Sequence, residues 1–206
     1  MGCRDSDEWY VIYSRRRILE MRKEAGRRCL AAFDIGTTTI AGYLLDGADG
    51  RTLAVESRMN PQAQYGADVI MRANYALEHG TEALSMCVRK AVNEMLGSLA
   101  EDAGIRREDV FQVCVVGNTC MHHLFLGISP ASLVHAPYTP AVSERLVLNA
   151  RATGGGLWSG CAGACRVDYA FGYCRICGSG YLWMSAGYQA GSAGRDFSDD
   201  RYWNEW

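Results

Sequence analysis

The chain has 206 residues, 49% of them hydrophobic, which is enough to bury the core of one large domain or two small ones. Its 21 basic and 23 acidic side chains leave a net charge of −2, which argues against a general nucleic-acid binder. No run of about 18 apolar residues offers a membrane span, and the N-terminal residues contain no apolar block of signal-peptide type. We therefore expect a cytoplasmic protein with no nucleic-acid and no membrane partner, whose nine cysteines are thiols or metal ligands.

The composition divides the chain into three parts. Residues 30–151 alternate apolar runs with polar turns, as a globular domain does. Between Leu157 and Trp206 only four residues are Leu, Ile or Val, too few to fill a close-packed interior, and no strand or helix periodicity emerges. We predict a leader or linker segment at 1–29, a folded unit at 30–151 and an irregular tail at 152–206.

The folded unit begins with β-prone runs. Leu30–Asp34 and Ile40–Leu45 are separated by Gly36–Thr39, which predicts a β-hairpin with a tight polar turn. Gly47–Gly50 is typical of the next turn, and Thr52–Ser57 is predicted to form a third strand.

Two helices are expected next, over Ala67–Leu77 and Thr81–Ala100, and Gly104 suits the end of the second. The second helix has one apolar face, made of Leu84, Val88, Ala91, Val92, Met95 and Leu99.

A buried strand is predicted at Phe111–Val116 and a short helix at Cys120–Leu126, with Pro130 at the first position of another brief helix. His122 and His123 are adjacent and would point about 100° apart on a helix, so we expect one packed and one exposed side chain rather than a metal pair. Strands, helices, then a strand and a helix form an α/β pattern.

The residues with the clearest chemistry follow the first strand: Asp34, Gly36, Thr37, Thr38 and Thr39. Backbone N–H groups at such a turn can converge on an anion, and glycine lets a phosphate approach closely. An aspartate at the strand end can hold Mg²⁺ through its waters. The alternative is a plain hairpin turn with a capping aspartate.

The string Asp-Ile-Gly-Thr-Thr-Thr in a hairpin resembles the first phosphate motif of the actin, sugar-kinase and chaperone ATPase superfamily. Three further strings resemble one branch of it, the reductive activators of corrinoid-dependent methyltransferases, which are ferredoxin-linked ATPases. They are Asn60–Ile70, Val116–Leu124 and Ala136–Pro140, and the resemblance covers roughly Arg28 to Arg151.

The resemblance implies a ribonuclease-H-like subdomain with a mixed sheet and helices. It implies that Asp34, Gly36, Thr37, Thr38 and Thr39 contact the phosphates of ATP and its Mg²⁺, with Asp34 as a catalytic residue.

It also places Gly117, Asn118 and Thr119 at the nucleotide, because this triplet closes a strand and opens a helix with free N–H groups. An ordinary N-cap at Asn118 is the alternative. Asp68 is a second candidate catalytic carboxylate, at the cleft or partner face, and a helix N-terminal aspartate is equally consistent with its position.

The tail contains Cys161, Cys165, Cys174 and Cys177, whose spacing permits a four-cysteine zinc site. A different hypothesis is a shifted reading frame. Read one base later, codons for Arg201–Trp206 permit Asp-Ile-Gly-Thr-Asn-Gly, the form of the superfamily's second phosphate motif.

The same shift over Phe171–Tyr181 permits Leu-Gly-Ile-Ala-Gly-Phe-Val-Gly-Ala-Asp-Thr, which resembles the activators just before that motif. The change of frame would lie between Arg151 and Trp158, and the chain would then lack the second phosphate loop.

The leading functional hypothesis is a fragment of an ATP-dependent reductive activator that reactivates cob(II)alamin proteins, with a corrinoid protein as partner. The parent family carries a 2Fe–2S cluster, but only Cys3 and Cys29 precede Leu30, so we expect no cluster ligands here. We expect this chain to be inactive alone. The alternatives are a small-molecule kinase of the same superfamily, with a carboxylate such as Asp68 as base, and a non-enzymatic module with the zinc site.

Overall fold

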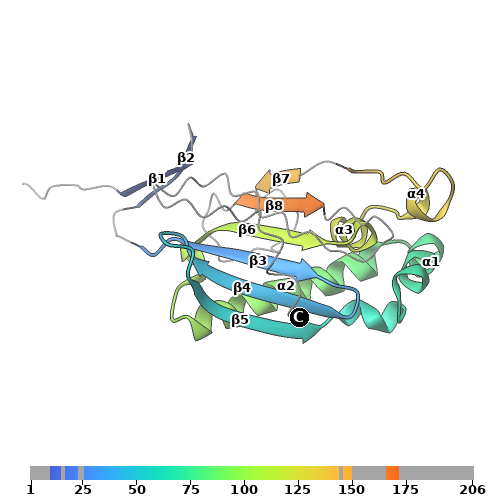
Figure 1. The fold of residues 1–206 in the computed structure, drawn as a ribbon, viewed down its shortest axis with the longest axis horizontal. Coiled ribbons are helices and arrows are strands. Elements are labelled where there is room, and N and C mark those ends of the chain that lie inside the picture. Colours follow the sequence, from blue (N-terminus) through green and yellow to red (C-terminus); the bar gives the residue numbers. More distant parts are fainter. Residues whose placement is uncertain (1–9, 15–16, 23–25, 144–145, 150–165, 172–206) are drawn as a thin grey trace, which may run out of the picture.

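The structure is a computed structural model that describes residues 10–14, 17–22, 26–143, 146–149 and 166–171. Its main element is a mixed sheet of six strands in the order β5-β4-β3-β6-β8-β7 (Figure 1). A separate antiparallel pair, β1 and β2, lies before it in the chain. The strands are β1 Tyr10–Ser14, β2 Arg17–Arg22, β3 Cys29–Ile35, β4 Thr39–Asp46, β5 Thr52–Met59, β6 Val110–Gly117, β7 Leu146–Asn149 and β8 Arg166–Phe171.

The predicted hairpin is confirmed. β3 and β4 pair antiparallel, with Ile35 opposite Ile40, so the tight turn lies at residues 36–38. β5 pairs with β4, as the third predicted strand, after the turn at Gly47–Gly50. Asp46 and Asp49 close this turn by accepting hydrogen bonds from the N–H groups two residues further on.

α2 lies along one face of the sheet, and α1, α3 and α4 lie toward the carboxyl ends of β3 and β6 (Figure 1). The predicted apolar face of α2 is confirmed, because all six residues that define it are buried. α2 packs against β4 and β5 and against α3. The helices are α1 Val69–His79, α2 Glu82–Asp102, α3 Thr119–Leu126 and α4 Ala131–Val134, with short 3₁₀ turns η1 Pro61–Tyr65 and η2 Arg107–Asp109.

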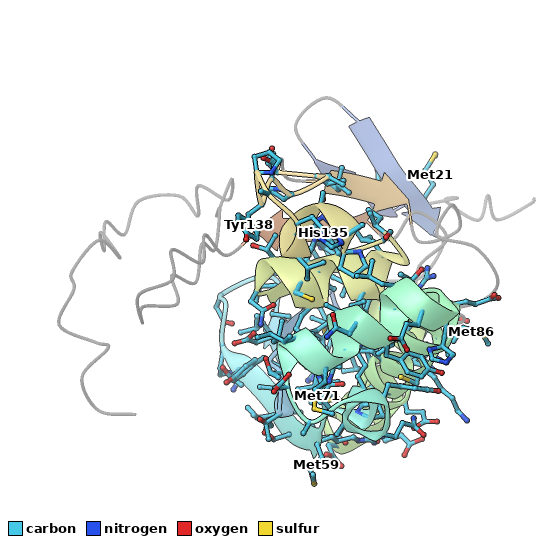
Figure 2. The ribbon with its side chains drawn as sticks, turned by 90° about the vertical axis from the view of Figure 1, so that its right-hand side faces the viewer. Met21, Met59, Met71, Met86, His135 and Tyr138 are labelled. Atoms are coloured by element: carbon cyan, nitrogen blue, oxygen red, sulfur yellow. The ribbon has the colours of Figure 1, made fainter. Side chains whose placement is uncertain are left out.

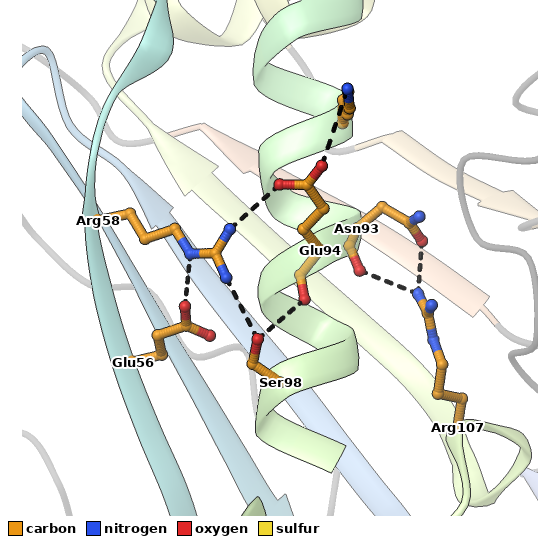
Figure 3. Close-up of polar contacts among 7 residues, drawn as sticks. Glu56, Arg58, Asn93, Glu94, Ser98 and Arg107 are labelled. Atoms are coloured by element: carbon orange, nitrogen blue, oxygen red, sulfur yellow. Dashed lines mark hydrogen bonds and ion pairs between the residues drawn. The ribbon is translucent and has the colours of Figure 1, made fainter. Parts of the chain in front are cut away.

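Polar contacts also connect the sheet to α2 (Figure 3). Arg58 of β5 donates hydrogen bonds to Glu94, at 3.2 Å, and to the hydroxyl of Ser98, at 3.2 Å. At the other side of α2, the Arg107 guanidinium donates to the backbone carbonyl of Asn93. These contacts connect α2 to β5 on one side and to η2, the turn before β6, on the other.

The sheet has two different faces. In β3 the residues Cys29, Ala31, Phe33 and Ile35 are buried in the core beneath the helices, whereas Asp34 is exposed. Successive side chains of a strand point to opposite faces. Asp34 therefore lies on the face of the sheet opposite the core, at the last strand position but one.

The carboxyl ends of β3 and β6 lie side by side. These strands pair in parallel, with Asp34 opposite Val116 and Ile35 opposite Gly117. Both strands therefore release the chain at the same edge, one into the 36–38 turn and the other into α3. Figure 2 views the molecule from this end, where the side chains of Met59 and Met71 are exposed.

Two expectations about the ends of the chain need correction. Arg166–Phe171 lies in the predicted irregular tail, yet it forms β8 and pairs in parallel with β6. The segment at 1–29 contains β1 and β2 and the first residue of β3. In β8, Val167, Tyr169 and Phe171 occupy alternate positions, which is the period of a strand, and the segment pairs with β6.

Local corrections concern Pro130 and the two histidines. Pro130 is the N-cap of α4, one position before the predicted one. His122 and His123 are both buried, because α3 lies under other elements on both sides.

Candidate phosphate-binding site

The β3–β4 turn requires glycine at position 36. A Cβ built on Gly36 would lie 2.6 Å from the backbone oxygen of Thr39, closer than real Cβ atoms come. The chain can reverse this tightly only without a side chain there. Thr38 and Thr39 are exposed and Thr37 is half-buried, so these hydroxyl-bearing residues flank an accessible turn.

Two carbonyl oxygens of the turn accept hydrogen bonds, and two of its N–H groups have no backbone partner outside the strand ladders. The oxygens of Gly36 and Thr38 each accept a hydrogen bond from Asn60, both at 2.8 Å. Outside the strand ladders, and within the described part of the chain, no backbone oxygen accepts from the N–H groups of Thr37 or Thr38. Adjacent N–H groups without carbonyl partners are the donors that an anion-binding turn uses.

Asp34 lies beside this turn on the open face of the sheet. Its side chain is exposed, although neighbouring protein atoms desolvate the carboxyl enough to raise its pKa above the ordinary value. A raised pKa means that the carboxylate lacks compensating donors or cations in the protein itself. A hydrated divalent cation would supply that compensation, so the residue fits a role in holding Mg²⁺.

The second predicted segment meets the first. The Asn118 amide donates to the hydroxyl of Thr37 at 3.3 Å, and its oxygen accepts from the N–H of Met121 at 2.9 Å. Asn118 is thus the N-cap of α3, which was the alternative interpretation. It also contacts the β3–β4 turn directly, through Thr37. Thr119 is the first residue of α3, where N–H groups are not used within the helix.

Gly117 permits this close approach. Its Cβ would lie 3.0 Å from the backbone oxygen of Ile35, the last residue of β3. A larger residue would push the two strand ends apart. The structure therefore brings together Asp34, Gly36, Thr37, Thr38 and Thr39 with Gly117, Asn118 and Thr119 at one edge of the sheet.

Asp68 caps α1 and bonds to that helix rather than to the β3–β4 turn. It is the N-cap of α1, exposed, and its carboxylate accepts from the N–H of Met71 at 2.8 Å. Among the described residues it makes no hydrogen bond to the phosphate turn. Its position agrees with the helix-capping alternative, and its catalytic role remains a prediction.

Three buried polar side chains near the turn were not predicted as site residues. Asn60, Gln62 and Arg72 are all fully buried. Gln62 donates to the Leu84 oxygen at 3.1 Å, and Arg72 donates to the Gly66 oxygen at 2.8 Å. The dipeptide Asn60-Pro61 was a usable signal, because an Asx residue before proline favours a capped turn.

Neither a metal-ligand cluster nor a membrane-spanning helix occurs among the described residues. Residues in the described ranges contain no group of three or more His, Cys, Asp or Glu placed to hold a metal ion. Cys161, Cys165, Cys174 and Cys177 lie outside the described residues, as does most of the 152–206 segment. In the described part of the chain, no helix has the length and apolar character needed to cross a membrane.

The chain is similar to known proteins in sequence and in fold. The chain is 39% identical over 110 residues to the corrinoid activation enzyme RamQ of Eubacterium limosum, covering 52% of this chain and 18% of RamQ. A solved structure titled reductive activator for corrinoid, iron-sulfur protein superposes with a TM-score of 0.68 at 31% identity. That match covers 74% of this chain and 24% of the other.

The chain thus spans about a fifth to a quarter of the length of these relatives. Its α/β fold, with a mixed sheet and helices, is that of the matched activator structure. The family model described as RACo middle region matches residues 30–162, most of the chain, and starts within β3. The chain belongs to the RACo middle region family.

Proposed function

We propose that this chain is part of an ATP-dependent reductive activator of corrinoid proteins and supplies one side of its nucleotide site. The observation that carries the proposal is the junction of two predicted phosphate segments, where Asn118 contacts Thr37 beside a turn with free amides. The relatives RamQ and the corrinoid, iron-sulfur protein activator support the corrinoid part of the proposal.

The residues have separate tasks in this proposal. In this proposal the backbone N–H groups of Thr37 and Thr38 and the hydroxyls of Thr37 to Thr39 bind phosphate oxygens, which carry the negative charge of ATP. The N-terminus of α3 adds unused N–H groups and the positive end of a helix dipole. Asp34 holds Mg²⁺, and the bound ion offsets charge on the phosphates.

In the whole activator, nucleotide binding would drive a conformational change that permits an uphill electron transfer to the corrinoid protein. The 2Fe–2S cluster of the parent family would deliver that electron from another part of the polypeptide. The residues described here bind and orient the nucleotide and perform no electron transfer.

The proposal is tested by calorimetric titration of the full chain with ATP, in the presence and absence of Mg²⁺. We expect binding that depends on Mg²⁺ in the wild type. Asp34→Asn should remove the Mg²⁺ dependence, because the amide cannot hold a hydrated cation as a carboxylate does.

Asp49→Asn is the matched control, since Asp49 is also exposed and lies in the turn at the other end of β4. It should leave both affinity and Mg²⁺ dependence unchanged. Equal Mg²⁺ dependence in wild type and Asp34→Asn would refute the assigned role of Asp34. Absence of any ATP binding by the wild-type chain would contradict the nucleotide proposal itself.

The partner is tested separately, by biolayer interferometry of the immobilised chain against a purified corrinoid iron–sulfur protein. We expect a saturable signal with that protein and none with the same protein after heat denaturation. Identical signals from both samples would contradict a specific corrinoid-protein partner.

A further inference from the structure

Asn60 contacts the phosphate turn more extensively than any residue predicted from the sequence. It is fully buried, at the end of β5, and its backbone N–H donates to the Thr38 oxygen while its side-chain amide donates to the Gly36 oxygen. Both bonds are 2.8 Å long, near the most favourable distance for N–H···O contacts.

We propose that Asn60 is the positioning residue that holds the phosphate turn in its anion-binding conformation, an inference that rests on the proposed nucleotide-binding function. A trans peptide unit is planar and directs its C=O and N–H to opposite sides. With the Gly36 oxygen fixed on Asn60, the N–H of Thr37 points away from Asn60. The bond from the Asn60 backbone N–H to the Thr38 oxygen orients the peptide unit between Thr38 and Thr39 in the same way.

Asn60 can perform this task because its own side chain is fixed. Its oxygen accepts from the N–H of Gln62 at 3.0 Å, so it is also the N-cap of η1, in which Pro61 is the first residue. The amide nitrogen lies 3.4 Å from the Gln62 side-chain oxygen and 3.8 Å from the sulfur of Met121. Amide donor and acceptor are thus both used, and the side chain has one orientation.

The same sulfur connects the turn to α1. Arg72, fully buried in α1, lies with its guanidinium 3.5 Å from the Met121 sulfur and donates to the Gly66 oxygen. Burial lowers the pKa of Arg72, and no carboxylate in the described residues forms an ion pair with it. Asn60, Met121 and Arg72 therefore form a buried chain of contacts behind the turn.

A purely structural role for Asn60 predicts something different from a positioning role. If Asn60 only capped η1, its replacement would lower stability and leave the turn amides and the nucleotide affinity of the folded protein unchanged. The comparison therefore needs a variant with the same chemical change at an equally buried amide that bonds elsewhere.

Asn60→Asp and Gln62→Glu form that pair. Each replaces a buried amide by a carboxyl group and removes one N–H donor to a backbone oxygen, of Gly36 in the first case and of Leu84 in the second. Asn60→Ser is the third variant: it keeps a capping oxygen, adds no buried charge and cannot reach the Gly36 oxygen.

Two measurements on the full chain decide the question. The ¹⁵N order parameter of the Thr37 N–H, whose orientation the bond to the Gly36 oxygen fixes, should fall from about 0.85 to below about 0.6 in Asn60→Asp and Asn60→Ser but not in Gln62→Glu. Mg·ATP should bind about tenfold more weakly to both Asn60 variants, the change expected on losing one net hydrogen bond of about 1.4 kcal/mol.

Order parameters and affinities that match those of Gln62→Glu in both Asn60 variants would overturn the positioning role. If the wild type bound no Mg·ATP, the proposed function would fail, but the order-parameter comparison would still decide whether Asn60 holds the turn. If the wild type bound Mg·ATP and Asn60→Ser bound it equally well, only the inference about Asn60 would fail.

Discussion

Asp34 has an exposed side chain and yet a carboxyl pKa that is raised above its ordinary value. Its neighbours in β3, Phe33 and Ile35, are buried in the core, and strand alternation leaves Asp34 on the other face. Desolvation by nearby protein atoms raises the pKa of its carboxyl, and no cation in the described residues pairs with it. A carboxylate in this condition gains from a metal ion, which is the chemistry that the proposed site needs.

Asp68 offers a test that separates capping from chemistry. Its carboxylate accepts from the Met71 N–H, and asparagine caps helices as well as aspartate does. We expect Asp68→Ala to lower the free energy of unfolding by about 1 kcal/mol and Asp68→Asn to change it little, as measured by urea denaturation. Unchanged stability in Asp68→Asn together with lost Mg·ATP binding would instead place Asp68 in the nucleotide site.

His122 predicts a pH dependence of stability. Burial, and then the neighbouring His123, lower the pKa of His122 to about 4. The unfolded chain, with a histidine pKa of about 6.5, binds a proton between these values that the folded chain does not. Stability therefore falls as the pH falls through this window, by about 2 kcal/mol from pH 7 to pH 5.

The comparison for His122 is His122→Gln, which has no ionisable side chain. The free energy of unfolding in urea, measured at pH 7 and pH 5, should drop by about 2 kcal/mol less in this variant than in the wild type. The same loss in both proteins would show that other groups cause the pH dependence.

At the scale of elements, the periodicity of the sequence predicted the helices and strands whose formation depends on neighbouring residues. The β3–β4 hairpin, the apolar face of α2 and the strand before α3 follow from alternation and from turn residues, and the structure confirms them. The junction of the 34–39 and 117–119 segments was expected only from the family resemblance. It depends on the parallel pairing of β3 and β6, in which Ile35 lies opposite Gly117, 82 positions later in the sequence.

Non-local pairing also explains what the sequence did not predict. Arg166–Phe171 contains too few aliphatic residues to indicate a strand, yet it pairs with β6 along its whole length. Asn60 is polar and precedes proline, which indicates a turn, but its burial and its two bonds to the hairpin arise only when β5 lies beside β4. The periodicity of a segment can indicate a strand, but it does not say with which distant strand the segment pairs.

The packing of α2 gives a matched pair of methionines for a stability test. Met95 is fully buried under the sheet, whereas Met86 of the same helix is 62% exposed and lies at the surface (Figure 2). We expect Met95→Ala to lower the free energy of unfolding by about 2–5 kcal/mol and Met86→Ala to change it by less than about 0.5 kcal/mol. Equal effects of the two substitutions in urea denaturation would contradict the observed orientation of α2.

At the scale of the whole molecule, the described residues form one side of the proposed nucleotide site. The superfamily that the chain resembles holds ATP between two related subdomains, and rate enhancement of phosphoryl transfer depends on groups positioned on both sides. We therefore expect the chain to bind Mg·ATP and hydrolyse it little, as measured by phosphate release. Robust turnover that Asp34→Ala abolishes would show that these residues suffice for catalysis.

The most direct test of the central claim is a ¹H–¹⁵N NMR titration of the full chain with Mg·ATP. If the β3–β4 turn and the start of α3 form one phosphate site, the amide signals of Gly36 to Thr39 and of Gly117 to Thr119 should shift together, with one dissociation constant. They should not shift together in Asp34→Asn under the same conditions. Shifts confined to other residues, or two segments that respond with different dissociation constants, would contradict the account.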